Sequence, residues 1–329
     1  MCISWILKIV VDCRMPSLSF DEGKDGRALA IVRGGANDGD VLYLNDSDSF
    51  GRKPKPELNR TKYLKLFPKM KTADRTSAFN RIEEALHDAK PATFFDSEPT
   101  LKVVYEKVLK DASTTKEITL DDEGLFELLP TSDPKKREVW YVAGASGSGK
   151  SYIAKGLLTM YHKLYPSRGC YLISKLKQDA TLDALKFLKR INIDSLVDDY
   201  PELSEFQDCF VVFDDVDSLV GIQQKTVLTL IDDLASTGRH TCTSMAFLTH
   251  YLTRFTKTRL LLNEATNVVV YPQSTSFNAL TYLLKQYIGV DPEDIKRHRK
   301  FGSRWLMYTK GFPQIMISQQ DAELLHQRD

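Results

Sequence analysis

Val139-Trp-Tyr-Val-Ala-Gly-Ala-Ser-Gly-Ser-Gly-Lys-Ser151 is the stretch that decides the fold class of this chain of 329 residues. An apolar run is followed by the pattern GxxxxGK[ST], from Gly144 to Ser151, and residues 150–164 then carry apolar side chains at helical spacing. Glycines allow such a loop to curl so that its backbone N–H groups point at phosphate oxygens, and the N-terminus of the following helix adds partial positive charge. The order of strand, loop and helix therefore predicts a phosphate-binding loop.

The residue types in this loop predict that it binds ATP with Mg²⁺. We expect Lys150 to bridge the β- and γ-phosphates and the Ser151 hydroxyl to hold the metal ion. The residues expected to contact the nucleotide are Gly144, Ala145, Ser146, Gly147, Ser148, Gly149, Lys150, Ser151 and Tyr152.

From Val139 onward, short apolar runs alternate with longer amphipathic stretches. Strands are expected at 139–143, 170–174, 209–213, 243–249 and 267–271, and helices at 150–164, near 180–190, at 221–236 and at 256–264. Apolar strands separated by helical crossovers are typical of a mostly parallel sheet covered on both faces. The predicted fold class is α/β: a P-loop core with flanking helices at 132–329, which ends in a β-hairpin within 304–317.

Residues 1–131 are expected to form a smaller α+β region. Two β-prone runs around a Gly/Asn/Asp turn predict a hairpin near 27–45, and residues 74–90 and 99–112 have helical spacing. The proline-containing arm 46–75 lies between them. From Arg52 to Arg75 it carries nine Lys or Arg against Glu57 and Asp74, which makes it the most basic part of the chain.

Two acids follow the apolar run 210–213. A carboxylate at the carboxyl end of such a strand faces Mg²⁺, and a second one beside it can polarise an attacking water. We therefore expect Asp214 to lie on the metal side and Asp215 to activate the water, with Asp217 as a weaker alternative for either role. The other interpretation is a solvated acidic stretch, because residues 194–217 hold nine acids and no Lys or Arg.

The positions of two further side chains make them candidates for the nucleotide site. His250 follows the expected strand 243–249, so it can contact the γ-phosphate or the attacking water, or it is an ordinary surface or core histidine. Arg239 follows Gly238 at the end of the expected helix 221–236, where a cation is also favoured simply by the helix dipole.

The order of these motifs resembles the FtsK–HerA superfamily of DNA-pumping ATPases, and within it the genome-packaging ATPases of poxviruses and other large DNA viruses. The resemblance covers about residues 139–320. It implies that Arg239 is an arginine finger acting on the neighbouring subunit's nucleotide and that His250 is the sensor, where glutamine is usual. Asp215 stands where many relatives have glutamate. Similar segments are Thr258-Arg259…Asn263-Glu264, Tyr271-Pro272 and Ser303-Arg304-Trp305…Phe312-Pro313, which makes Arg259 the alternative finger.

Composition limits the remaining choices. With 45 Lys and Arg against 44 Asp and Glu, the net charge of +1 excludes a polycation that coats nucleic acid by bulk charge. The short basic cluster 296–300 is therefore either a solvated helix face or a local contact with the phosphate backbone of DNA. The five cysteines include no CxxC pair, which indicates a reducing compartment. The first residues lack the features of a signal sequence, and no segment has about 20 apolar residues in a row.

These observations predict a soluble intracellular Mg²⁺-dependent ATPase that forms a homo-oligomeric ring and moves double-stranded DNA. The resemblance implies viral genome packaging, a capsid partner, and a location at the host-cell assembly site or in the virion. Two alternatives stay open. One is a P-loop kinase or nucleotide-metabolising enzyme with a small acceptor, and the other is a scaffold whose assembly is gated by a nucleotide.

Overall fold

The computed structural model describes residues 16–23, 26–45, 58, 60–64, 67, 70–88, 90–113, 116–253 and 255–325. The expectations for residues 1–11 and for most of the basic arm 46–75 lie outside these ranges. The chain divides into two compact units, one of residues 1–26 and 44–116 and the other of residues 27–43 and 117–329. This division differs from the expected boundary at 131/132, because strands within 27–43 and 117–128 pair inside the second unit.

The first unit is mainly helical. Its elements are β1 (Ser17–Ser19), α1 (Arg60–Tyr63), α2 (Thr72–His87), a 3-10 helix (Ala92–Phe95) and α3 (Pro99–Ser113). Helix α2 buries Phe79 and Ile82, which its helical spacing places on one face. Phe67 meets Phe79 edge to face with ring centroids 5.1 Å apart, and Phe95 packs on Tyr105. Aromatic burial therefore holds this unit together.

The second unit is built on a ten-stranded sheet in the order β4-β14-β13-β12-β11-β6-β10-β9-β7-β8. The six strands from β11 to the β8 edge of the sheet are parallel to one another. The other four, β4, β14, β13 and β12, pair antiparallel. The parallel strands are β6 (Val139–Ala143), β7 (Cys170–Ser174), β8 (Leu188–Ile191), β9 (Phe210–Asp214), β10 (Ser244–Thr249) and β11 (Asn267–Val270). The antiparallel strands are β4 (Glu117–Thr119), β12 (Leu306–Thr309), β13 (Ile315–Ile317) and β14 (Asp321–Leu324).

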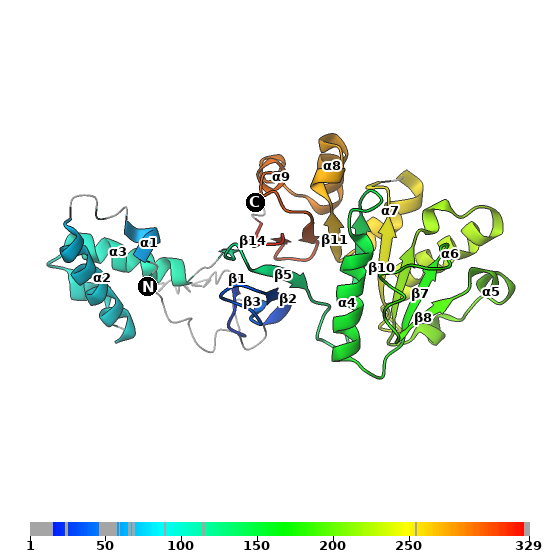
Figure 1. Ribbon diagram of the computed structural model, residues 1–329, viewed down its shortest axis with the longest axis horizontal. Coiled ribbons are helices and arrows are strands. Elements are labelled where there is room, and N and C mark those ends of the chain that lie inside the picture. The colour runs from blue at the N-terminus through cyan, green and yellow to red at the C-terminus, as the bar shows by residue number, and fades with distance from the viewer. Residues whose placement is uncertain are drawn as a thin grey trace, which may run out of the picture. The chain divides into compact units, whose positions relative to one another are not determined.

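Helices connect these strands and cover the sheet (Figure 1). They are α4 (Lys150–Leu164), α5 (Ile193–Asp198), α6 (Gly221–Thr237), α7 (Phe255–Glu264), α8 (Phe277–Leu283), which runs into a π-turn (Leu284–Ile288), and α9 (Pro292–Arg299). Every residue of β6, β9, β10 and β11 is buried. A strand buried throughout needs cover on both faces, so the expected α/β fold with a mostly parallel sheet is confirmed.

A smaller antiparallel sheet includes β2 (Arg27–Arg33), β3 (Val41–Asn45) and β5 (Leu125–Leu128). The expected hairpin is present, because Val32 N–H donates to Asp40 O at 2.8 Å and Gly39 N–H donates back to Val32 O at 3.0 Å. Strand β5 then pairs with the other side of β2.

Two expectations need correction. The helix expected near 180–190 is wrong, because turns occupy this segment up to β8, which pairs with β7. The Asp179 carboxylate accepts hydrogen bonds from the backbone N–H groups of Thr181 and Leu182, and this local bonding competes with a helix. The C-terminal hairpin is also larger than expected, since β14 adds to β13 and β4 adds to β14.

Candidate nucleotide-binding site

The loop between β6 and α4 has the backbone geometry of a phosphate cradle. Gly147 and Gly149 have φ of 72° and 113°, left-handed values that side chains other than hydrogen strongly disfavour. Gly144 N–H donates to Thr249 O at 3.0 Å, which ties the loop to the carboxyl end of β10. The Ser148 hydroxyl is buried without a hydrogen-bond partner among the described residues. A buried polar atom of this kind fits a site for phosphate oxygens.

Lys150 begins α4, and its ammonium group lies inside the curl of the loop. Nζ donates to Gly144 O at 2.9 Å and to Ala145 O at 3.2 Å. Burial lowers the pKa of Lys150, while the nearby Asp215 and Asp214 act in the opposite direction. The charge of Lys150 is therefore stabilised by the carboxylates of Asp214 and Asp215 at the carboxyl end of β9, as well as by the loop carbonyls.

Asp214 ends β9 and is buried. Burial raises its pKa to about 6, and the neighbouring carboxylates of Asp215 and Asp179 add to the rise. A divalent cation would remove this repulsion, because it interacts favourably with all three charges. The environment of Asp214 therefore fits the metal-side role expected for it.

Asp215 has a left-handed backbone with φ of 52°, which is strained for a residue other than glycine. Its Oδ1 lies 2.7 Å from His250 Nε2, and His250 Nδ1 lies 3.4 Å from Lys150 Nζ. The structure thus brings together three side chains that the sequence singled out separately. They form a row at the carboxyl ends of β9 and β10, next to the phosphate-binding loop.

Asp217 contacts the end of β10 next to this row. Its Oδ2 accepts a hydrogen bond from the Thr249 hydroxyl at 2.6 Å and one from His250 N–H at 3.3 Å. These contacts fix the end of β10, and they orient the segment that carries His250. Asp217 therefore holds the segment that carries His250 in place, and its carboxylate also favours the charged form of Lys150.

Asp179 is a site residue that sequence reasoning missed. It lies in the turn after β7, where its Oδ2 is 3.5 Å from the Ser151 hydroxyl. Hydroxyl and carboxylate oxygens are the ligands that Mg²⁺ prefers, so Ser151, Asp214 and Asp179 together fit a magnesium site. The available signal was that Asp179 follows a buried strand of the same parallel sheet, at the edge where the other acids lie.

Tyr152 completes the predicted set at the first turn of α4. It exposes 73 % of its surface. Its side chain is therefore accessible to solvent at the start of α4.

Arg239 lies away from this row. Thr243 N–H donates to Gly238 O just before β10 begins, and Arg137, before β6, donates to Leu234 O and Ala235 O at the end of α6. Arg239 is thus exposed at the amino ends of the strands, whereas the loop lies at their carboxyl ends. Arg259 is exposed on α7, which follows the carboxyl end of β10.

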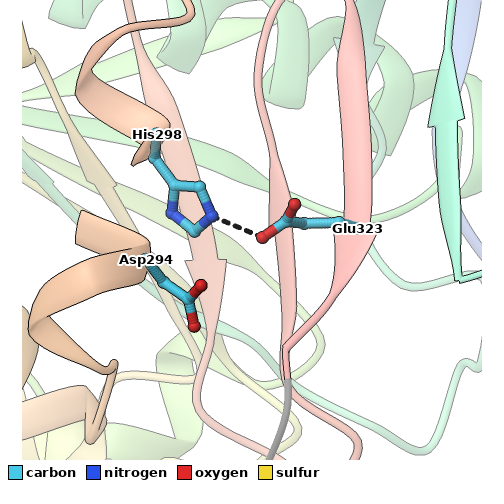
Figure 2. A group of neighbouring side chains, drawn as sticks. All are labelled: Asp294, His298 and Glu323. Carbon is cyan, nitrogen blue, oxygen red and sulfur yellow. Dashed lines mark hydrogen bonds and ion pairs between the residues drawn. The ribbon is translucent and has the colours of Figure 1, made fainter. Parts of the chain in front are cut away.

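A second cluster of titratable groups lies on α9 and β14 (Figure 2). Ligating atoms of Asp294, His298 and Glu323 lie within 4.8 Å of one another. Arg297, however, donates to both carboxylates, at 3.0 Å to Asp294 Oδ1 and 2.7 Å to Glu323 Oε1. Burial opposes the charge of Glu323, but hydrogen bonds from His298 and Arg297 outweigh it and lower its pKa. This cluster is a charge network, with His298 and Glu323 buried at its centre, that links α9 to β14.

Within the described ranges, every helix is too short or too polar to span a lipid bilayer.

Solved structures with similarity to the chain have low sequence identity. The genome-packaging NTPase B204 of Sulfolobus turreted icosahedral virus 2, in complex with AMPPCP, is 14 % identical and has a TM-score of 0.39, over 57 % of this chain and 98 % of that one. The cytoplasmic domain of the type VII secretion ATPase EccC of Thermomonospora curvata is 14 % identical with a TM-score of 0.40, over 62 % and 28 %. The pCW3 conjugation coupling protein TcpA, with ATPγS, is 13 % identical with a TM-score of 0.43, over 89 % and 77 %.

The sheet order and the glycine-rich loop of this chain themselves define its P-loop fold. No family model matches the sequence. A viral protein is more similar: the "Uncharacterized protein V3" of Sputnik virophage is 32 % identical over 240 residues, which are 70 % of this chain and 96 % of that protein. The chain therefore belongs to the same protein family as protein V3 of Sputnik virophage.

Proposed function

We propose that this protein is a Mg²⁺-dependent ATPase motor that moves double-stranded DNA during the packaging of a viral genome. The observation that carries the proposal is the row of Lys150, His250 and Asp215 beside a phosphate-binding loop, with Asp214 buried next to it. A lysine at the phosphates, a metal-side carboxylate and a second carboxylate for water are the parts that phosphoryl transfer to water requires.

Each side chain has a role in this reaction. The backbone N–H groups of the loop and Lys150 bind the phosphates, and Ser151, Asp214 and Asp179 would hold Mg²⁺, which neutralises developing phosphate charge when bound. Asp215 accepts a hydrogen bond from the attacking water. His250 lies between Asp215 and Lys150, so it links the group that orients the water to the group that binds phosphate.

Arg239 acts between subunits in this proposal. An arginine at the amino ends of the strands is too far from its own loop to touch the nucleotide there. In a ring it would reach the γ-phosphate bound to a neighbouring protomer, where a guanidinium stabilises transition-state charge. Arg259 on α7 is the alternative for this role.

Helix α9 supplies the proposed contact with DNA. Lys296, Arg299 and Lys300 are exposed, while Ile295 and His298 are buried, so the cations share the outer face. The same face borders a groove lined by Phe277, Glu293, Asp294, Lys296, Arg297, Arg299 and Lys300. Such a surface binds the phosphate backbone without reading sequence, which suits a translocating motor. The viral origin of protein V3 supports the packaging role.

The decisive experiment measures ATP turnover with and without long duplex DNA. The proposed motor hydrolyses ATP in the presence of Mg²⁺ and is stimulated by DNA. Lys150→Ala should abolish turnover, because it removes the point charge at the phosphates and leaves the loop backbone in place. Arg33→Ala, which removes an exposed ion pair with Glu127, is the matched control and should behave as wild type.

The same assay separates the alternatives. A kinase with a small acceptor would show no stimulation by DNA and would transfer phosphate to the acceptor. A nucleotide-gated scaffold would bind ATP without turnover in the wild type. Normal turnover in folded Lys150→Ala protein would reject the assignment of the loop.

A further inference from the structure

Arg304, just before β12, lies against the outer side of the phosphate-binding loop. Its Nε donates to Ser148 O at 2.8 Å and its Nη2 donates to Gly147 O at 3.2 Å, although 156 residues separate Arg304 from Ser148. A Cβ atom placed on Gly149 would lie 3.5 Å from the guanidinium carbon. The guanidinium group thus covers the backbone of the three loop residues 147–149.

These two hydrogen bonds fix the orientation of two peptide planes. In a trans peptide, the C=O of one residue and the N–H of the next point in opposite directions. Holding Gly147 O and Ser148 O toward Arg304 therefore turns the N–H groups of Ser148 and Gly149 to the inner side of the loop. Ser148 N–H accordingly donates to Ala145 O across the loop at 3.2 Å. The inner side is where phosphate oxygens would bind.

The C-terminal strands hold Arg304 itself in position. Its backbone N–H donates to Gln319 Oε1 at 2.7 Å, in the turn between β13 and β14. Gln319 N–H donates to the Ser303 hydroxyl at 3.0 Å, and Gln319 O accepts from Phe126 N–H at 2.7 Å. Hydrogen bonds to the β13–β14 turn, which is itself bonded to β5 and to Ser303 before β12, therefore fix the position of Arg304. We call this set of hydrogen bonds around Gln319 the frame.

We infer that Arg304 is a positioning residue for nucleotide binding, which pre-forms the phosphate-binding conformation of residues 147–149 from outside the loop. It is not a catalytic residue, because its Nε and Nη2 donate to carbonyl oxygens of the loop and not to the reacting atoms. The inference rests on the proposed nucleotide site. It adds that the C-terminal strands contribute to nucleotide affinity through a two-point contact that the planar guanidinium fork can make.

The test compares the affinity for Mg²⁺-ATPγS of the full-length wild type with that of Arg304→Ala, Arg304→Lys and the control Arg33→Ala. Arg304→Ala should weaken binding about tenfold or more, because two charge-assisted hydrogen bonds are lost. Arg304→Lys keeps the charge but lacks the fork, so it should remain clearly weaker than wild type. In turnover assays KM should rise more than kcat falls, and circular dichroism should show an unchanged fold.

A second pair of variants tests the frame without touching the arginine. Gln319→Ala removes the acceptor for Arg304 N–H and should weaken nucleotide binding by a smaller factor. Gln319→Glu keeps an acceptor oxygen and should restore most of the affinity. This pair decides the question if Arg304→Ala does not fold.

Wild-type affinity in folded Arg304→Ala, or in Gln319→Ala when Arg304→Ala does not fold, would overturn the inference. So would full recovery in Arg304→Lys, because charge alone would then account for the effect. If instead the wild type does not bind nucleotide, the proposed function fails. Loss of binding in Lys150→Ala with none in Arg304→Ala leaves the proposed function standing and rejects only the role of Arg304.

Discussion

Asp214 and Asp215 are neighbours in the sequence, but their environments differ. Asp214 is buried at the end of β9, whereas Asp215 turns through a left-handed backbone to meet His250. We expect Asp214→Ala to weaken the binding of Mg²⁺-ATP, since it removes an oxygen ligand. Asp215→Asn should keep binding and lose hydrolysis, because the amide is a poorer acceptor for the water. Titration of nucleotide and single-turnover hydrolysis measure the two effects.

The control for this pair is Asp194→Asn, since Asp194 lies in the first turn of α5, where its carboxylate accepts a hydrogen bond from Gln223. It should change neither binding nor turnover. An equal loss of binding in Asp214→Ala and Asp215→Asn would show that the roles of the two acids are not divided in this way.

The raised pKa of Asp214 also predicts a pH-dependent stability. The pKa of Asp214 is about 6 in the native protein and 3.8 for an ordinary aspartate. Between these two pH values the native state therefore binds more protons than the unfolded state. Stability then falls as pH rises through the window, because the slope follows the protons bound by the unfolded minus the native state. Asp214→Asn should therefore raise the free energy of unfolding, without metal or nucleotide, by up to ~3 kcal/mol near neutral pH.

Urea unfolding at about pH 4 and at about pH 7.5 measures this effect. The gain should be present at the higher pH and largely absent at the lower one, where the wild-type carboxyl is protonated in the native protein. A variant that is less stable than wild type at the higher pH would contradict the burial argument.

At the scale of elements, α9 combines an anchored inner face with a basic outer face. Glu323 binds His298 (Figure 2). Glu323 also accepts from Arg297, and His298 Nδ1 lies 3.0 Å from the Tyr308 hydroxyl. Because this network holds the inner face, charge reversal on the outer face should leave the helix folded. Lys296→Glu with Lys300→Glu should weaken duplex DNA binding and reduce the salt dependence of the binding constant by about one unit of slope per lost phosphate contact.

The matched control reverses two exposed lysines at the other end of the sheet, Lys186→Glu with Lys189→Glu. It has the same change in net charge, so any effect of bulk charge appears in both variants. Equal DNA binding and equal DNA-stimulated turnover in the two variants would mean that α9 is only a solvated face.

At the scale of the whole molecule, the proposed finger requires a ring. Arg239→Ala should leave nucleotide binding nearly intact and cut turnover by about 10³-fold or more, the range for an arginine finger. Mixing inactive Arg239→Ala subunits with inactive Lys150→Ala subunits creates interfaces with an intact finger and an intact loop. Part of the activity should return, which a steady-state ATPase assay would detect.

Formation of mixed rings is checked with differently tagged subunits. If mixed rings form and remain inactive, Arg239 acts within its own chain or only supports the fold, and Arg259→Ala is tested in the same way.

The sequence alone determined the parts of this protein that local patterns encode. Apolar runs gave the buried strands β6, β7, β9, β10 and β11, and GxxxxGK[ST] between a strand and a helix identified the loop, because the backbone of that loop depends on its own glycines. The acids after β9 and His250 after β10 were found for the same reason, since the carboxyl ends of parallel strands meet at one edge. The helix predicted near 180–190 was wrong, because hydrogen bonds to the Asp179 carboxylate stabilise turns there in spite of the helical spacing of apolar residues.

Only the tertiary structure decided which distant residues share the site. The spacing between Lys150 and His250 does not reveal that Nζ and Nδ1 lie 3.4 Å apart, and nothing local marks Asp179 as a neighbour of Ser151. The role of Arg304 depends on strand order, because β12 pairs with β11, which in turn pairs with β6, the strand that leads into the loop. Contacts between residues this far apart depend on how the strands are ordered and packed, and a sequence pattern records only what is close along the chain.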